Sequence, residues 1–147
     1  MNTTELNNII NAPGFIGAHS FDTLPNRPEG DHSIVVNTAP SNSPGAHWLA
    51  LVLKNGKFYF LDSYGRDISD LTFSQQFKDT IKEYAKGSKI FHNKQWLQSL
   101  TSNVCGDYCV YFIQEMHRVG FRSMMSVFTD NFKFNDMIVT KYVKIIS

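Results

Sequence analysis

The chain has 147 residues, and its 42% hydrophobic and 14% aromatic content excludes an intrinsically disordered protein. Its length suits a single domain spanning 1–147, because domains of about 100 to 150 residues are the commonest size. Fourteen Lys and Arg residues against 13 Asp and Glu residues give a formal charge of +1, so no global field attracts nucleic acid or anionic lipid.

Cysteine usage and the N-terminal segment bear on the compartment. The N-terminal segment MNTTELNNII lacks the basic and apolar parts of a secretory signal, and no run of about 18 apolar residues predicts a membrane span. Cys105 and Cys109 are the only cysteines, and their spacing suits neither a disulfide nor the usual zinc half-site. We therefore expect a reducing compartment.

The predicted elements of the N-terminal half begin with a short helix whose N-cap is Thr3 or Thr4. Residues 15–30 contain several glycines and prolines, which predict an ordered loop. The β-branched segment SIVVNT then predicts a short buried strand. HWLALVLK and KFYFLDS predict a β-hairpin around Asn55-Gly56, with strands over residues 47–54 and 57–63.

The C-terminal half is predicted to be mainly helical. Apolar residues at helical spacing predict an amphipathic helix over residues 73–86, and a short strand is expected at residues 89–92. The segment VCGDYCVYFIQEMHRVG predicts a central, buried helix with Ser102 or Asn103 as its N-cap. Residues 129–146 repeat a helical rhythm of apolar side chains.

Cys105 is the candidate nucleophile. A thiol attacks as thiolate, and its pKa falls at a helix N-terminus beside a histidine. Cys105 lies in the first turn of the predicted central helix, and Gly106 after it allows a substrate backbone to approach closely. The alternative is that Cys105 is a small buried hydrophobe, which is the reading we give to Cys109.

His47 is the candidate base among five histidines. It opens the strongest predicted strand, directly after a turn-rich loop, so its imidazole can face a cleft while the sheet holds its backbone. The returning strand of the hairpin ends at Asp62, which can orient His47 and stabilise its charged form. The alternatives are a filler histidine and an aspartate that caps a strand end.

Oxyanion stabilisation requires hydrogen-bond donors beside the nucleophile. Gln98 can supply a side-chain amide next to the backbone N–H groups of Cys105 and Gly106, and Gln95 is its rival. We place Trp48 and Asn103 in the substrate cleft; the alternative for Trp48 is that it fills the core.

Four segments of the chain resemble the adenovirus protease (adenain) family and its relatives in virophages and Polinton/Maverick elements. They are GFIGAHSFDTLP, SIVVNTAPSNSPGAHWLALVL, FYFLDSYG and LQSLTSNVCGDYCVYF, which together span about residues 14 to 113. The resemblance implies an α+β fold in which a central mixed sheet packs against helices, with the nucleophile at the N-terminus of a central helix. This papain-like fold is shared with proteases of ubiquitin-like proteins.

The resemblance also implies a thiol protease and assigns its residues. It makes Cys105 the nucleophile, His47 the base, Asp62 the third member, where adenovirus enzymes have Glu, and Gln98 the oxyanion donor. It implies cleavage of viral capsid and virion precursor proteins at Gly-containing motifs during maturation. The expected location is therefore the virion and the infected host cell.

Activation is a point of departure from the family. Adenovirus enzymes are activated by a disulfide-linked peptide and by DNA, but KGSKIFHNKQW in this chain has no cysteine, which argues against covalent activation. The sequence requires no cofactor. Nucleic acid is a further candidate partner, because four lysines lie near one face of the predicted helix and could follow a phosphate backbone: Lys78, Lys82, Lys86 and Lys89. The alternative is that these lysines form an ordinary solvated face.

Three other functions compete with this interpretation. A deconjugating protease that cuts after the Gly-Gly of a ubiquitin-like protein would share the same four residues. A catalytically silent capsid-binding module would keep the fold without turnover. A metal site from His47, Asp62 and Cys105 lacks a nearby fourth ligand and gives Gln98 no part, so we expect no metal.

Overall fold

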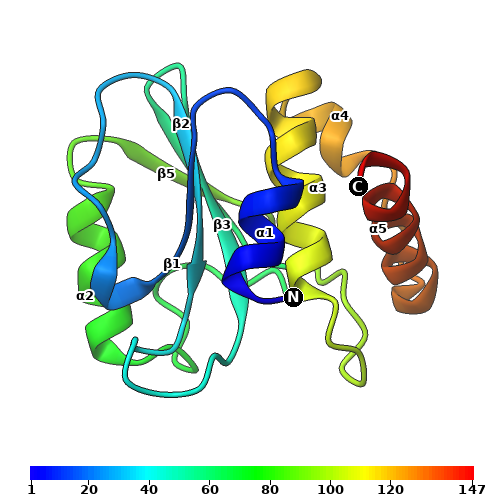
Figure 1. The fold of residues 1–147 in the computed structure, drawn as a ribbon, viewed down its shortest axis with the longest axis horizontal. Helices are drawn as coiled ribbons and strands as arrows, with labels where there is room; N and C mark the ends of the chain where they lie inside the picture. The colour runs from blue at the N-terminus through cyan, green and yellow to red at the C-terminus, as the bar shows by residue number, and fades with distance from the viewer.

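A computed structural model describes residues 1–147 as one mixed β-sheet between two layers of helices (Figure 1). The strands are β1 (Phe15–Ser20), β2 (His32–Asn37), β3 (Trp48–Lys54), β4 (Lys57–Leu61) and β5 (Lys89–His92). The helices are α1 (Thr3–Ile9), the 3-10 helix η1 (Phe21–Thr23), α2 (Gln75–Tyr84), α3 (Cys105–Arg118), α4 (Phe121–Met125) and α5 (Phe132–Ile146). The predicted α+β class is confirmed.

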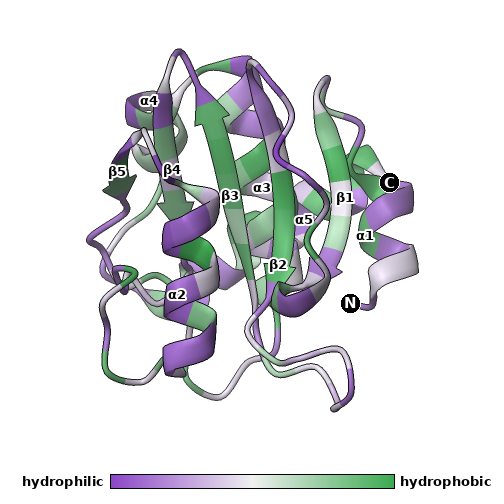
Figure 2. Ribbon diagram, turned by 90° about the vertical axis from the view of Figure 1, so that its left-hand side faces the viewer, coloured by the Kyte–Doolittle hydropathy of each residue, from purple (hydrophilic) through white to green (hydrophobic).

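The sheet has the strand order β1-β2-β3-β4-β5. The outer pairs β1–β2 and β4–β5 are parallel, whereas the inner pairs β2–β3 and β3–β4 are antiparallel. Helix α2 covers one face, and α1, α3, α4 and α5 lie on the other (Figures 1 and 2). No helix in the chain combines the length and the apolar character needed to cross a membrane.

Strand β3 is apolar on both faces because both faces of the sheet are covered. Leu49, Leu51 and Leu53 belong to the core on the α2 side, while Ala50 and Val52 belong to the core around α3. A strand buried on both sides has no polar face to solvate, which is why this segment shows a continuous apolar run. Its rigidity holds the residue that precedes it, His47, in place.

The β3–β4 hairpin brings the two ends of these strands together. Asn55 and Gly56 both have positive φ, 52° and 77°, as a tight primed turn requires. Ala50 then pairs with Leu61, so the residue after β4 lies beside the start of β3. The predicted hairpin is confirmed, and it places Asp62 close to His47.

The predicted loop over residues 15–30 is wrong in its first part. Residues Phe15–Ser20 form β1, which pairs in parallel with β2 after a register shift between Phe15 and Ala18. Gly17 lies in this irregular part with a φ of 105°. Gly17 resembles a loop residue in the sequence, but here it accommodates the irregularity in an outer strand.

Helix boundaries also differ from the prediction. Asn2, not a threonine, caps α1 through a reciprocal pair of hydrogen bonds with Glu5. Helix α3 begins at Cys105 without a side-chain cap, because its N-cap position is Val104 and not the predicted Ser102 or Asn103. Helix α2 ends at Tyr84, so only two of the four predicted lysines lie on it: Lys78 and Lys82.

Candidate active site

Cys105 is the first residue of α3 and is half-buried. Its Sγ accepts a hydrogen bond from the backbone N–H of Trp48 at 3.5 Å. Burial by itself would raise the pKa of the thiol, but His47 and this N–H outweigh burial and lower the Cys105 pKa below its usual range. Cys109 is fully buried and burial raises its pKa, so it is the inert cysteine, as predicted.

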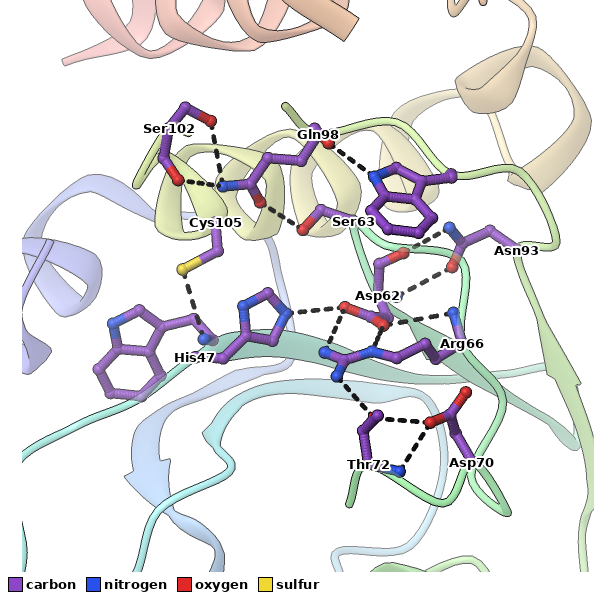
Figure 3. A network of polar contacts seen from close by, with 12 residues as sticks. His47, Asp62, Ser63, Arg66, Asp70, Thr72, Asn93, Gln98, Ser102 and Cys105 are labelled. Carbon is purple, nitrogen blue, oxygen red and sulfur yellow. Dashed lines mark hydrogen bonds and ion pairs between the residues drawn. The ribbon is translucent and has the colours of Figure 1, made fainter. Parts of the chain in front are cut away.

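His47 links Cys105 to Asp62. The His47 Nε2 atom lies 2.7 Å from Asp62 Oδ1, which leaves Nδ1 as the ring nitrogen for Cys105 (Figure 3). Burial would lower the pKa of His47, but the hydrogen bond to Asp62 and the nearby Cys105 thiol overcome burial and raise the pKa to about 9. The arrangement therefore favours a thiolate paired with an imidazolium.

An aromatic side chain covers the His47 ring. Tyr64 stacks on the imidazole with ring centroids 5.1 Å apart and planes inclined by 22°. Trp96 then packs edge-on against Tyr64, with centroids 5.5 Å apart. Because stacking restricts rotation of the ring, it supports the orientation in which His47 faces both Asp62 and Cys105.

Asp62 is fully buried and fixed through its backbone and its carboxylate. Asn93 accepts from the Asp62 N–H at 2.9 Å and donates to the Asp62 carbonyl at 2.6 Å. Arg66 donates from Nε to Asp62 Oδ2 at 2.7 Å. Burial would raise the pKa of Asp62, but His47 and Arg66 keep it below its usual range, so the carboxylate is ionised.

Gln98 is buried, and its side-chain amide is oriented from both ends. Its Oε1 accepts from the Ser63 hydroxyl at 2.6 Å, and its Nε2 donates to the Ser102 carbonyl at 3.1 Å and to the Ser102 hydroxyl at 3.3 Å. Figure 3 shows the amide nitrogen on the side of Ser102 and Cys105. If one N–H of Gln98 Nε2 turned away from the Ser102 hydroxyl, it could donate to an oxyanion that forms near Cys105.

The rival oxyanion donor is directed elsewhere. Gln95 donates from Nε2 to the Thr129 carbonyl at 3.0 Å, toward the segment that leads into α5. Of the two glutamines, only Gln98 therefore has an amide held beside the start of α3, and the alternative reading of Gln95 is wrong.

A cleft of about 520 Å³ opens at Cys105, and the predicted cleft residues Trp48 and Asn103 both line it. Met1 forms another part of its lining, with its carbonyl accepting from Trp48 Nε1 at 2.8 Å. The prediction that Gly106 leaves room for substrate is wrong, since a Cβ there would lie 3.0 Å from the Met1 Cβ. Gly106 instead allows Met1 to pack against α3.

Three residues that hold this arrangement were missed from the sequence: Ser63, Arg66 and Asn93. Of the three, only Arg66 had a signal in the sequence, because it is a positive charge four residues after the negative charge of Asp62. Ser63 and Asn93 carry no such signal, because each reaches its partner only through the pairing of β4 with β5 and the turn after it. The structure has no group of three or more His, Cys, Asp or Glu side chains placed to hold a metal ion.

Comparison with known proteins gives two matches. A family model described as adenovirus endoprotease matches residues 13–141, a range that contains Cys105, His47, Asp62 and Gln98. The chain belongs to the adenovirus endoprotease family. It is also 27% identical over 110 residues to a protein named Protease from bovine adenovirus 7. That alignment covers 69% of this chain and 50% of the relative, so the chain spans about half the length of the relative it matches.

Proposed function

We propose that this protein is a cysteine endopeptidase with Cys105 as nucleophile, His47 as general base and acid, Asp62 as its orienting carboxylate and Gln98 as an oxyanion donor. The observation that supports it most is the link from the half-buried Cys105 thiol through His47 to the buried Asp62. Membership of an endoprotease family supports the same reaction class.

In the proposed reaction, His47 Nδ1 holds the thiol proton and the Cys105 thiolate attacks a peptide carbonyl carbon. A C–S bond forms, and the carbonyl electrons move to an oxyanion that receives hydrogen bonds from the Cys105 N–H and Gln98 Nε2. The imidazolium gives its proton to the leaving amine as the C–N bond breaks. Water, deprotonated by His47, then releases the acyl group from Cys105.

The proposed substrates are viral capsid and virion precursor proteins, cut at Gly-containing motifs. Family membership supports this substrate class. The lining of the cleft includes Gly45 and Ala46 as well as Trp48. Residues this small let a substrate backbone approach closely, which suits a substrate segment that contains Gly.

The experiment is incubation of the purified chain with an electrophilic peptide probe ending in Gly-Gly, with and without DNA, followed by mass mapping of the adduct. We expect an adduct on Cys105 that does not form when the chain is denatured before the probe is added. Faster cleavage of capsid precursors than of a ubiquitin-like fusion favours the maturation role, and the reverse order favours deconjugation. The absence of an adduct both with and without DNA would contradict the proposal.

Replacing Gln98 with Leu should lower kcat by about 10²-fold to 10³-fold, because one oxyanion donor is lost at nearly constant volume. Alkylation of Cys105 by iodoacetamide should stay close to wild type, since Gln98 makes no bond to the thiol. The matched control is Gln95→Leu, which removes an amide directed at Thr129. Equal kcat losses in the two variants would contradict the assignment.

The pH dependence of kcat/KM should be bell-shaped, with its alkaline limb near pH 9. Activity requires the thiolate and the imidazolium together; the lowered pKa of Cys105 sets the acid limb, and the pKa of His47, raised to about 9, sets the alkaline limb. His47 titrates in the unfolded chain near its ordinary 6.5, so its charged form stabilises the fold below that pH and this contribution is lost as pH rises through about 9. An alkaline limb near pH 6.5 would show that His47 is uncoupled from Asp62 and Cys105.

A further inference from the structure

Arg66 occupies the side of Asp62 that His47 leaves open. Its Nε donates to Asp62 Oδ2 at 2.7 Å, and its Nη2 lies 3.5 Å from Oδ1, the oxygen that bonds His47 Nε2. Its backbone N–H also points at Oδ2, at 3.3 Å. The buried Asp62 carboxylate thus faces two cationic side chains, with His47 on Oδ1 and Arg66 mainly on Oδ2 (Figure 3).

The guanidinium is itself held in place. Its Nη1 donates to the Thr72 hydroxyl at 3.0 Å, and that hydroxyl donates to the Asp70 carboxylate at 2.6 Å. Its central carbon lies 4.4 Å from the centre of the Phe73 ring, which is a cation–π distance. The Arg66 side chain is 22% exposed, so the pair with Asp62 is largely shielded from water.

Charge and geometry give Arg66 two consequences for Asp62. A fork-shaped guanidinium that grips one carboxylate oxygen fixes the plane of the group and therefore the direction of the other oxygen. Asp62 is fully buried, so water does not screen the charge of its carboxylate. A second cation beside that carboxylate therefore weakens the electrostatic stabilisation that Asp62 gives to the charged form of His47. With Arg66 absent, His47 would be the only cation in contact with that carboxylate.

We propose that Arg66 is a positioning residue of this site, which aims Asp62 Oδ1 at His47 and shares the Asp62 charge so that His47 can return its proton to the leaving amine. The inference rests on the proposed function for its effect on turnover. The charged and titratable groups that face the pair are His47 before β3, Cys105 on α3, Tyr64 next to the pair, and Asp70 beyond Thr72.

The test is Arg66→Gln. We expect kcat to fall by about 10-fold to 100-fold through lost orientation, with KM within about two-fold, because Arg66 lies outside the cleft at Cys105. We also expect the His47 pKa, followed by NMR in a Cys105→Ala background, to rise by about 0.5 to 1 unit once Asp62 has a single cationic partner. A merely structural Arg66 would leave that pKa unchanged or let it fall toward 6.5.

Two further variants separate charge from geometry. Arg66→Lys keeps the charge but loses the fork, so the His47 pKa should stay within about 0.3 unit of wild type while kcat falls. Thr72→Val keeps Arg66 and removes the hydroxyl that accepts from Nη1 and donates to Asp70, so it remains informative if Arg66→Gln fails to fold. We expect it to lower kcat by about two-fold to five-fold with the His47 pKa unmoved.

The matched control is Arg118→Gln, which breaks an arginine–carboxylate pair at the far end of α3, with Glu115. It should change neither kcat nor the His47 pKa. Arg66→Gln with a wild-type kcat and His47 pKa would overturn the inference. Because the NMR titration needs no turnover, a chain that cleaves nothing but still shows the pKa rise would contradict the proposed function while supporting the charge sharing.

Discussion

Replacing Cys105 with Ala should abolish turnover, with a loss of kcat of at least about 10⁴-fold. The other thiol cannot replace it as the nucleophile, because Cys109 is fully buried and burial raises its pKa. Stability should change by less than about 1 kcal/mol, since Cys105 is only half-buried and starts its helix without serving as the cap. Turnover of a peptide substrate and thermal unfolding measure the two effects.

Cys109→Ala is the matched control for this substitution. It also removes a sulfur atom, but from Cys109, one turn further along α3 in the buried core. The loss leaves a small cavity and should lower the free energy of unfolding by about 1 to 2 kcal/mol. Activity and alkylation at Cys105 should persist. If Cys105→Ala kept wild-type activity, or if the probe adduct mapped to Cys109, the assignment of the nucleophile would be wrong.

His47→Ala should lower kcat by at least about 10³-fold and change the chemistry of the thiol. Burial would raise the pKa of Cys105, and the His47 partner is what brings it below the usual range. Without that partner the thiolate fraction near pH 7 should fall, and the rate of iodoacetamide alkylation should reach half its maximum at a higher pH than in wild type.

His117→Ala provides the comparison, because His117 is exposed at the C-terminal end of α3. It should leave both the alkylation profile and kcat unchanged. An alkylation profile of His47→Ala that overlaid the wild-type profile would show that Cys105 is not paired with His47.

Local patterns were sufficient for much of this fold. The Asn55-Gly56 turn between two apolar runs predicts the hairpin, and the structure has both residues at positive φ. Strand β1 was missed because its neighbour in the sheet is the parallel strand β2, whose pairing cannot be read from residues 15–20 themselves. Parallel strands are joined by a long crossover connection, so no hairpin turn marks the pair in the sequence. Gly17 also interrupts the strand pattern, because glycine is more typical of loops.

Local patterns place Cys105 at a helix start, His47 at a strand start, Asp62 at the end of a hairpin and Gln98 in a polar turn. The bond from Arg66 to Asp62, the contact of Asn93 with the Asp62 backbone and the orientation of Gln98 by Ser63 depend on the tertiary fold. These are hydrogen bonds between buried groups brought together by the β4–β5 pairing and the turns that follow it. Their partners follow from geometry, since a buried polar atom bonds whatever donor or acceptor the fold places within reach.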